Sequence, residues 1–391
     1  MTDPASGTLD LARLPATRRD LHAHPELAFD EHRTAGVIAD YLRGLGIEVT
    51  TGIGGTGVVG VIVGGRPGPT VGLRADMDAL PIVEELPREH ASTVQGVMHA
   101  CGHDGHCAIL LGAAELLSTA PDFAGTVVLV FQPAEEGGAG AAAMIADGVL
   151  EKFGILEIYG LHNIPGIPAG HFAVRPGTQL ASFDDLDIVL RATGGHAMAP
   201  HLTGDVIVAG SALVTELQTV VARRLDPLVP AVVSITQFTA GTTNNVLPPT
   251  ARLRGTARCL EAAARTEIEK LVRQICESVA AAHGVEVELT YEHRYPCTVN
   301  DPVAAARSAR VAAGLVGPDR VDPNCAGILA AEDFAFFLNE IPGAYAFIGN
   351  GPITAESGPV HNPAYDFNDA IIEPGARYLA AIARQALADL A

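Results

Sequence analysis

Residues that could bind a metal gather in one short stretch of this sequence, MHACGHDGH at positions 98–106. Cys101 and His103 are two residues apart, so a single loop could direct both side chains at one centre. A thiolate and an imidazole, together with carboxylates, are ligands for zinc and for neighbouring divalent ions. A buried thiol beside a surface imidazole would leave the same pattern, so the pair predicts a metal site only if other segments add ligands.

Three further segments each present such a side chain where an apolar run ends. The side chains are Asp76 and Asp78 after residues 70–75, Glu135 and Glu136 after Val127–Phe131, and His162 after residues 155–161. Short apolar runs are typical of buried strands, and the carboxyl ends of strands in an open α/β sheet line one crevice. Taken singly, each segment could equally be a solvated turn, an exposed acidic pair or a structural histidine. Together they predict convergence on one site.

The elements around these runs are predicted to be helical. Residues 9–45 contain two helices, and His22, His24 and Glu26 follow in the first of them. Because that segment is helical, ends at a proline and has no partner segment that supports a metal site, we interpret the three residues as structural and not as ligands. After the MHACGHDGH stretch, Asp104 is expected to cap a further helix.

The pattern changes at about residue 182. In DDLDIVLRA apolar and charged residues alternate, which predicts a strand with one buried face. Helical periodicity follows over residues 205–223 and 261–282, with further strands between and after them, in the order βαββαβ. That order is the ferredoxin-like arrangement. The predicted fold is therefore α/β: a domain formed by 1–181 and 296–391, with a mostly parallel central sheet flanked by helices, is interrupted by an inserted domain at 182–295.

Composition restricts the class of protein. The chain has 391 residues, 48% of them hydrophobic and 18% charged, and two domains are expected at this length. A net charge of −20 would repel a phosphate backbone, so nucleic acid is not an expected partner. The first residues lack the pattern of a signal peptide, and no run approaches the ~20 apolar residues that cross a bilayer. Six cysteines spread through a long chain do not resemble a secreted disulfide framework, so a cytoplasmic enzyme without a membrane partner is expected.

Several motifs in this order resemble one known family. They are RRDLHAHPELAFDE, LRADMDALPI, MHACGHDGH, FQPAEEGGAG, LHN, GGHAMAPH, TTNNVLP, AEDF and HNPAYDF, running from residue 18 to residue 367. The chain resembles the metal-dependent aminoacylase and carboxypeptidase superfamily, in its hippurate hydrolase and indole-acetyl-amino-acid hydrolase branch. The resemblance implies a catalytic α/β domain interrupted by a smaller lid domain.

The resemblance also implies roles for particular residues. Two divalent metal ions per subunit, with zinc expected before manganese or cobalt, would be held by Cys101, His103, Glu136, His162 and His361. Glu135 would be the general base, and Asp78 would orient and polarise the metal cluster. Other branches carry a metal-binding histidine where this chain has Asp76, and an aspartate as the bridging ligand. The bridging atom and the identity of the metals are therefore open here, and His106 is expected to be structural.

Three residues of the inserted domain resemble family residues that bind substrate. His196 resembles a histidine that stabilises the oxyanion, often from a partner subunit, and a homodimer through the lid domain is expected. Asn245 and Arg258 resemble residues that hold the substrate carboxylate, for which a guanidinium is well suited. Without the resemblance, His196 could be a surface histidine, and Arg258 could belong to a solvated basic face.

The expected activity is hydrolysis of N-acyl or N-aroyl amino acids to an amino acid and a carboxylic acid. A dipeptidase or carboxypeptidase would use the same chemistry on a different substrate. An amidase with Cys101 as nucleophile would need His103 as its base, and residues two apart on one loop rarely reach that geometry. A metal-binding scaffold without turnover would leave Glu135 unexplained.

Overall fold

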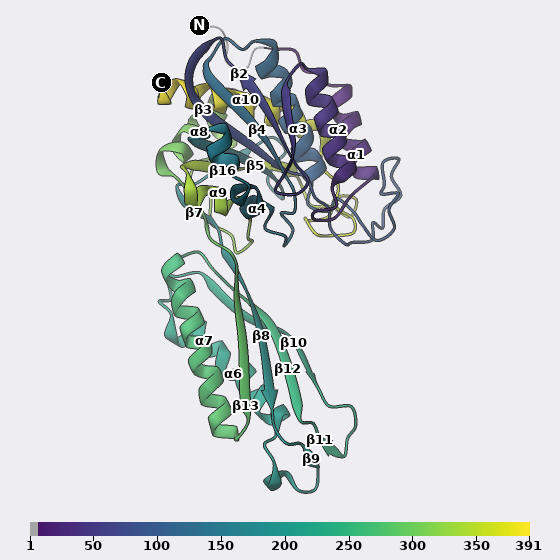
Figure 1. Ribbon diagram of the computed structural model, residues 1–391, viewed down its shortest axis with the longest axis vertical. Helices are drawn as coiled ribbons and strands as arrows, with labels where there is room; N and C mark the ends of the chain where they lie inside the picture. Colours follow the sequence, from purple (N-terminus) through teal and green to yellow (C-terminus); the bar gives the residue numbers. More distant parts are fainter. Residues whose placement is uncertain (1–6) are drawn as a thin grey trace. The chain divides into compact units, whose positions relative to one another are not determined.

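The computed structural model describes residues 7–391 (Figure 1). Contacts between residues divide this part of the chain into two compact units. Unit 1 comprises the described residues up to Gln179, with Val299–Ala326 and Asp333–Ala391. Unit 2 comprises Leu180–Thr298 and Gly327–Glu332, so it includes a short segment beyond the predicted insertion.

Unit 1 is built on an eight-stranded mixed sheet in the order β1-β2-β4-β3-β5-β16-β6-β15. The strands in that order are Glu48–Ile53, Gly57–Val63, Ala124–Gln132, Arg66–Asp76, Glu157–Pro165, Gly343–Gly351, Phe172–Ala173 and Val321–Asp322. The four central strands β4, β3, β5 and β16 run parallel, and β1 and β2 are antiparallel at one edge. This confirms the predicted α/β class with a mostly parallel central sheet.

Helices flank this sheet. They are α1 (Arg13–Ala23), α2 (His32–Gly44), α3 (His103–Thr119), α4 (Gly140–Ala146), α5 (Val149–Phe153), α8 (Pro302–Val316), α9 (Ala335–Glu340) and α10 (Ile372–Leu390). Helix α3 packs against α1, α2 and α10, and is buried along almost its whole length. The short strands β7 (Gly177–Leu180) and β14 (Thr298–Asn300) adjoin the points where the chain leaves and re-enters unit 1.

The predicted cap of α3 is wrong. The residue before the helix is Gly102, in the left-handed region at φ 90°, and Asp104 lies inside the first turn. Its buried carboxylate accepts a hydrogen bond from His22 Nδ1 at 2.9 Å and lies 3.5 Å from Arg18 Nη1. A tertiary ion pair has therefore replaced the local cap that the sequence pattern favoured.

Unit 2 is a two-layer α+β structure. Its sheet has the order β10-β12-β8-β13, and every pair is antiparallel. The elements are β8 (Ser182–Arg191), β9 (Gly195–His196), α6 (Val206–Thr219), β10 (Ala231–Ala240), β11 (Val246–Leu247), β12 (Thr250–Cys259), α7 (Ala262–His283) and β13 (Glu286–Tyr295). This is the ferredoxin-like arrangement, and buried and less buried residues alternate along β8.

Among the described residues, one helical segment is long and apolar enough to cross a membrane, Val206–Arg224. It comprises α6 and the single π-helical turn that follows, and it modifies the expectation that no such run exists. Val206, Ala209, Leu213 and Leu217 of α6 belong to the core of unit 2, and 33% of the segment is buried. A single segment of this kind is weak evidence for a membrane span.

Candidate metal centre

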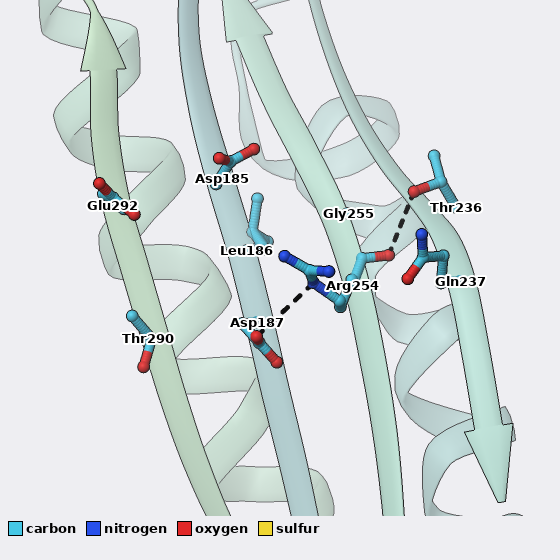
Figure 2. A pocket seen from close by; sticks show the side chains of 9 residues that line it. All are labelled: Asp185, Leu186, Asp187, Thr236, Gln237, Arg254, Gly255, Thr290 and Glu292. Atoms are coloured by element: carbon cyan, nitrogen blue, oxygen red, sulfur yellow. Dashed lines mark hydrogen bonds and ion pairs between the residues drawn. The ribbon is translucent and has the colours of Figure 1, made fainter. Parts of the chain in front are cut away.

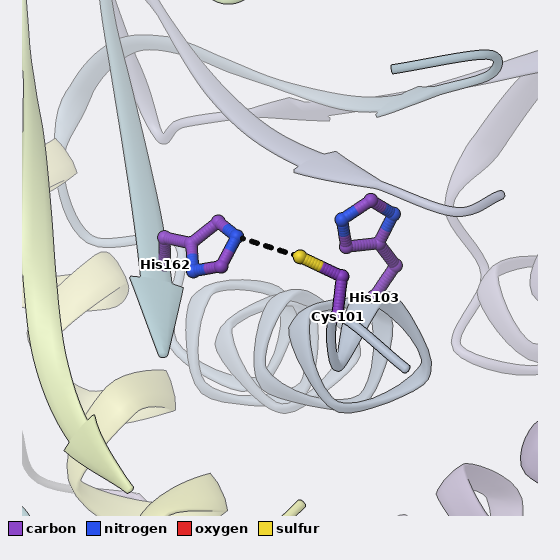
Figure 3. Close-up of side chains that lie close together, drawn as sticks. All are labelled: Cys101, His103 and His162. Carbon is purple, nitrogen blue, oxygen red and sulfur yellow. Dashed lines mark hydrogen bonds between the residues drawn. The ribbon is translucent and has the colours of Figure 1, made fainter. Parts of the chain in front are cut away.

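The five side chains expected to bind metal lie together in unit 1. Cys101, His103 and His162 form one group, in which one donor atom of each residue lies within 4.8 Å of the others (Figure 3). Cys101 and His103 are at the amino end of α3, and His162 is near the carboxyl end of β5. The Cys101 Sγ and His162 Nε2 atoms are 3.4 Å apart.

Cys101 belongs to a second group of donors as well. Cys101, Glu136 and His361 also have donor atoms that all lie within 4.8 Å of one another. His361 Nε2 is 3.1 Å from Glu136 Oε1. The backbone of His361 is in the left-handed region at φ 62°, and its N–H donates to Ala100 O at 2.7 Å. The sulfur of Cys101 is thus the atom common to two adjacent groups of three donors.

The candidate ligands have lone pairs that are available to bind a metal. His162 Nδ1 lies 2.6 Å from Asn163 O, a carbonyl that can only accept, so the proton is on Nδ1 and Nε2 carries the lone pair. Burial lowers the pKa of His162 well below its usual value, which favours the neutral ring. His103 Nε2 is buried without a hydrogen bond to any described residue. Glu136 Oε1 is buried 3.1 Å from His361 Nε2, in the same donor group. An unsatisfied imidazole nitrogen and a buried carboxylate oxygen beside a thiol fit divalent cations.

The Cys101 thiol is buried, and burial raises its pKa. A thiolate there would have to be stabilised by a positive charge. A bound cation deprotonates a coordinating thiol outright. The environment of Cys101 therefore suits a metal ligand better than an isolated nucleophile, which would need a lowered pKa.

Asp78 contacts both groups of donors. Its Oδ1 lies 3.2 Å from His103 Nδ1, and its Oδ2 accepts from the Glu136 backbone N–H at 2.9 Å. Because an ionised carboxylate can only accept, it keeps the proton of His103 on Nδ1 and leaves Nε2 free. Asp78 therefore orients one predicted ligand through its ring and another through its backbone.

Asp76 and His106 lie beside the cluster in supporting positions. His106 Nδ1 is 2.6 Å from Asp76 Oδ1, and His106 Nε2 accepts from the Asn163 backbone N–H at 3.0 Å. Both ring nitrogens are therefore engaged, in agreement with a structural role for this residue. Burial alone would raise the pKa of Asp76, but His103, His106 and Arg74 hold it well below its usual value.

Glu135 is buried, and its carboxylate lies close to the predicted ligands. One of its oxygens is within 4.8 Å of donor atoms of His103 and Glu136. It also accepts from the Asp333 backbone N–H at a long 3.4 Å. The Glu135 carboxylate is therefore adjacent to the cluster, but it belongs to neither of the two donor groups that share Cys101.

A buried ion network behind the cluster was missed by sequence reasoning. Arg74 donates to Asp76 Oδ2 at 2.7 Å, to Asp333 Oδ1 at 3.0 Å and to Gln132 Oε1 at 2.7 Å. Asp333 Oδ2 in turn accepts from the Ala141 backbone N–H at 2.9 Å. The AEDF motif contains Asp333, but nothing in its spacing indicates that it pairs with Arg74. The contacts link β3, β4 and the segment before α9.

His22, His24 and Glu26 belong to none of the donor groups among the residues described. His22 Nδ1 is bonded to Asp104, as described above, and His24 Nδ1 lies 2.8 Å from Asp20 O. The Glu26 carboxylate accepts from the backbone N–H groups of Arg33 and Thr34 in the first turn of α2, at 3.0 Å and 2.8 Å. These contacts agree with the structural interpretation.

The three predicted substrate residues lie in unit 2, and not together. His196 and Asn245 are exposed neighbours: Val246 pairs with His196, and Ala197 N–H donates to Asn245 O at 3.1 Å. Arg258 pairs with Phe183, near the start of β8, whereas His196 follows the end of β8. Eight residues of strand separate Phe183 from the end of β8, roughly 26 Å.

Arg258 differs from the other arginines on β12. Arg252 and Arg254 both face Asp187. Arg254 and Asp187 line a polar groove of about 310 Å³ on the sheet of unit 2 (Figure 2). The half-buried Arg258 donates instead to Leu329 O at 3.0 Å, and its guanidinium lies 4.7 Å above the centre of the Phe183 ring. The solvated-face interpretation therefore describes Arg252 and Arg254 better than Arg258.

The fold and the donor cluster define an α/β protein with a site suited to two metals, and comparison with known proteins identifies its family. The model of peptidase family M20/M25/M40 matches residues 72–385. The chain belongs to this family and is a hydrolase that acts on amide bonds.

Relatives with named activities align over most of the chain. It is 40% identical to a hippurate hydrolase of Campylobacter jejuni over 94% of both chains. It is 41% identical to thermostable carboxypeptidase 1 of Saccharolobus solfataricus, over 85% of this chain and 84% of that one. Among solved structures, the YXEP protein of Bacillus subtilis, described as a dinuclear metal-binding peptidase of the M20 family, is similar with a TM-score of 0.84. That structure is 34% identical, and the match covers 97% of this chain and 98% of the other.

Proposed function

We propose that this protein is a dinuclear metal-dependent amidohydrolase that cleaves N-acyl and N-aroyl amino acids into an amino acid and a carboxylic acid. The observation that carries the proposal is the pair of donor groups sharing Cys101, with Glu135 beside them. The hippurate hydrolase and the dinuclear peptidase among its relatives support the same chemistry.

In this proposal, Cys101, His103 and His162 would hold one divalent ion, and Cys101, Glu136 and His361 would hold the other. Sulfur and imidazole ligands favour zinc, while the carboxylate and metal availability leave manganese and cobalt as alternatives. When bound, the ions lower the pKa of water and polarise the amide carbonyl.

Glu135 is proposed as the general base. An amide is a poor electrophile and neutral water a poor nucleophile, so a proton has to be taken from water as it attacks the carbonyl carbon. The Glu135 carboxylate would accept that proton and then donate it to the nitrogen of the leaving amine. Adjacent Glu135 and Glu136 would divide the work, since a carboxylate that binds metal is not free to transfer protons.

The division of roles between the two glutamates can be tested directly. Glu135→Gln should keep the wild-type metal content and lose activity by at least about 100-fold, because general base catalysis contributes that much or more. The neighbouring variant Glu136→Gln is the matched comparison and should lose metal. Near-normal turnover of Glu135→Gln would refute the assignment of the base.

We further propose that Arg258 and Asn245 bind the carboxylate of the amino-acid product and that His196 stabilises the oxyanion. Arg258→Ala should raise KM for N-acyl amino acids far more than for the corresponding neutral amides. Arg252→Ala serves as the control, because that arginine pairs with Asp187 on the exposed sheet face. Equal effects on both substrate classes would exclude carboxylate binding by Arg258.

A homodimer through unit 2 is part of the proposal. Within one copy of unit 2, His196 and its neighbour Asn245 are too far from Arg258 to contact one small substrate with it, so a second copy would supply both His196 and Asn245. Several large apolar side chains of unit 2 are exposed, which is typical of an interaction surface: Met198, Leu202, Ile207, Val208, Leu228 and Val246. Strand β10 is also an edge strand of the sheet, open to pairing.

Mixing two inactive variants tests this arrangement. If His196 acts across the interface, Glu135→Gln and His196→Ala subunits should form mixed dimers with one intact site each. Equal amounts should then recover about a quarter of wild-type activity, since half of the dimers are mixed. No recovery, in dimers shown by light scattering to have exchanged subunits, would place His196 in the site of its own subunit, and an active His196→Ala variant would place it outside the reaction.

The carboxypeptidase among the relatives favours a second candidate, a peptidase of the same chemistry. A panel of hippurate-like N-acyl amino acids and dipeptides, assayed with metal analysis of the purified protein, separates the two. Absence of turnover on every member with both metals bound would instead favour a binding protein.

A further inference from the structure

One buried carboxylate close to the site has no role in the proposed reaction. Glu31, the last residue of the RRDLHAHPELAFDE motif, is fully buried. Its Oε1 accepts from the Ala134 backbone N–H at 2.8 Å, and its Oε2 accepts from Thr56 Oγ1 at 2.5 Å. The side chain does not cap α2, although Glu31 precedes that helix and its backbone carbonyl accepts from Ala35 N–H. The carboxylate is directed away from its own helix, toward the loop after β4.

The residue that Glu31 contacts immediately precedes Glu135. Ala134 is in the left-handed region at φ 55°, a conformation that a residue other than glycine keeps only when its surroundings determine it. Its carbonyl accepts from Gly140 N–H at 3.1 Å, which closes the loop on itself. The loop is packed tightly, because a Cβ on Gly140 would lie 1.7 Å from Pro133 O. The direction of the Glu135 side chain is thus linked to the hydrogen bond that Ala134 makes.

Two other buried carboxylates hold the rest of this loop. Asp78 Oδ2 accepts from the Glu136 N–H, and Asp333 Oδ2 accepts from the Ala141 N–H, both at 2.9 Å. Successive parts of the loop are therefore fixed by separate residues. Removing the Glu31 acceptor frees Ala134 and leaves the contact between Asp78 and Glu136 in place.

We propose that Glu31 is a positioning residue that fixes the carboxylate of Glu135 for proton transfer, while Asp78 separately fixes Glu136 for metal binding. The inference rests on the proposed role of Glu135 as general base. It predicts that loss of Glu31 slows turnover without loss of metal or of substrate affinity.

The test is Glu31→Met, which keeps a similar volume but offers no acceptor to Ala134. We expect kcat to fall about 10- to 100-fold, because small displacements of a catalytic group cost this much. KM should stay within about twofold, and both metals should remain bound, since Glu136 keeps its contact with Asp78. Glu31→Gln retains an oxygen that can accept from Ala134 N–H and should recover most of the lost kcat.

Glu115 provides a matched control. Its buried carboxylate also accepts from one backbone N–H, that of Asp10 at 2.9 Å, and from one hydroxyl, that of Tyr41 at 2.6 Å. It lies on α3 twelve residues after His103, about 18 Å along the helix. Glu115→Met should lower thermal stability to a similar extent and leave kcat of the folded protein unchanged.

Each outcome decides the inference. A kcat of Glu31→Met equal to that of Glu115→Met, a loss of metal in Glu31→Met, or a Glu31→Gln variant as slow as Glu31→Met would each overturn it. If Glu31→Met does not fold, Thr56→Val removes the hydroxyl that holds the other oxygen, and an unchanged kcat there would also overturn it. An active Glu135→Gln variant would instead remove the proposed function, so the two failures are distinguishable.

Discussion

Two buried N–H groups each donate to a different oxygen of Asp78. The effect of replacing Asp78 by asparagine therefore follows from this geometry. The amide of Asp78→Asn offers one oxygen, which can accept from either His103 Nδ1 or the Glu136 N–H but not from both. If the oxygen stays with Glu136, the NH2 group faces His103 and favours the tautomer with its proton on Nε2. That proton would occupy the atom that is otherwise free to bind a metal.

The size of the effect has two parts. A buried donor left without an acceptor costs about 1–3 kcal/mol of stability. Loss of the carboxylate that orients a metal-binding histidine typically weakens metal affinity 10- to 100-fold, or about 1.4–2.8 kcal/mol. We therefore expect Asp78→Asn to be destabilised by about 1–3 kcal/mol in urea unfolding of the metal-free protein. We also expect at least about tenfold weaker binding in competition with a coloured chelator.

The control for Asp78→Asn is a buried aspartate of unit 2. Asp184 accepts from Arg265, Tyr291 and His293, so Asp184→Asn should also lower stability, but it should leave metal affinity unchanged. If Asp78→Asn bound metal within about twofold of the wild-type protein, the argument from acceptor geometry would be refuted. The same would hold if Asp184→Asn weakened metal binding equally.

Three further predictions concern the same part of the chain. Chelation should abolish turnover, and added metal should restore it. The free energy of unfolding of the metal-free protein should be lower by about 4 kcal/mol than that of protein with free metal at a thousand times Kd. Turnover by the metal-free protein would favour Cys101 as a nucleophile. Burial alone would lower the pKa of His22, but Asp104 raises it from 6.5 to about 9, so this pair stabilises the fold fully below pH 6.5. That contribution should be lost as the pH rises toward 9, by at most about 1.4 kcal/mol per pH unit, and urea unfolding of His22→Gln should show a flatter profile. Gly102→Ala should lose metal and stability, because the φ of Gly102 is 90° and a Cβ there would lie 2.3 Å from Tyr365 Oη. Gly154→Ala is the control and should keep its metal, because Gly154 also has a left-handed φ but has open space around it. A Gly102→Ala variant with its full metal content would contradict the prediction.

Much of the fold could be predicted from local pattern. The continuous apolar run Val127–Phe131 predicted a strand covered on both faces, and its residues are fully buried in β4. The alternation in DDLDIVLRA likewise predicted β8 with one buried face. Periodicity over about ten residues reports which side of an element faces the core, and this information is contained in the local sequence. Local pattern failed at Asp104, whose carboxylate is bonded to a distant helix instead of capping its own.

The sequence by itself determined which side chains could do chemistry, because Cys101, Glu136 and His162 each follow or begin an element that a periodic pattern predicts. Only the tertiary structure decided how they meet: the order of the parallel strands brings them to one edge, and the sulfur of Cys101 is common to both groups of donors. The supporting contacts also join residues that are far apart in the sequence. Arg74 and Asp333 are separated by 259 positions, and Glu31 and Ala134 by 103. No spacing in the sequence indicates such pairs, since a hydrogen bond between buried groups depends on the packing of whole elements and not on the residues beside them.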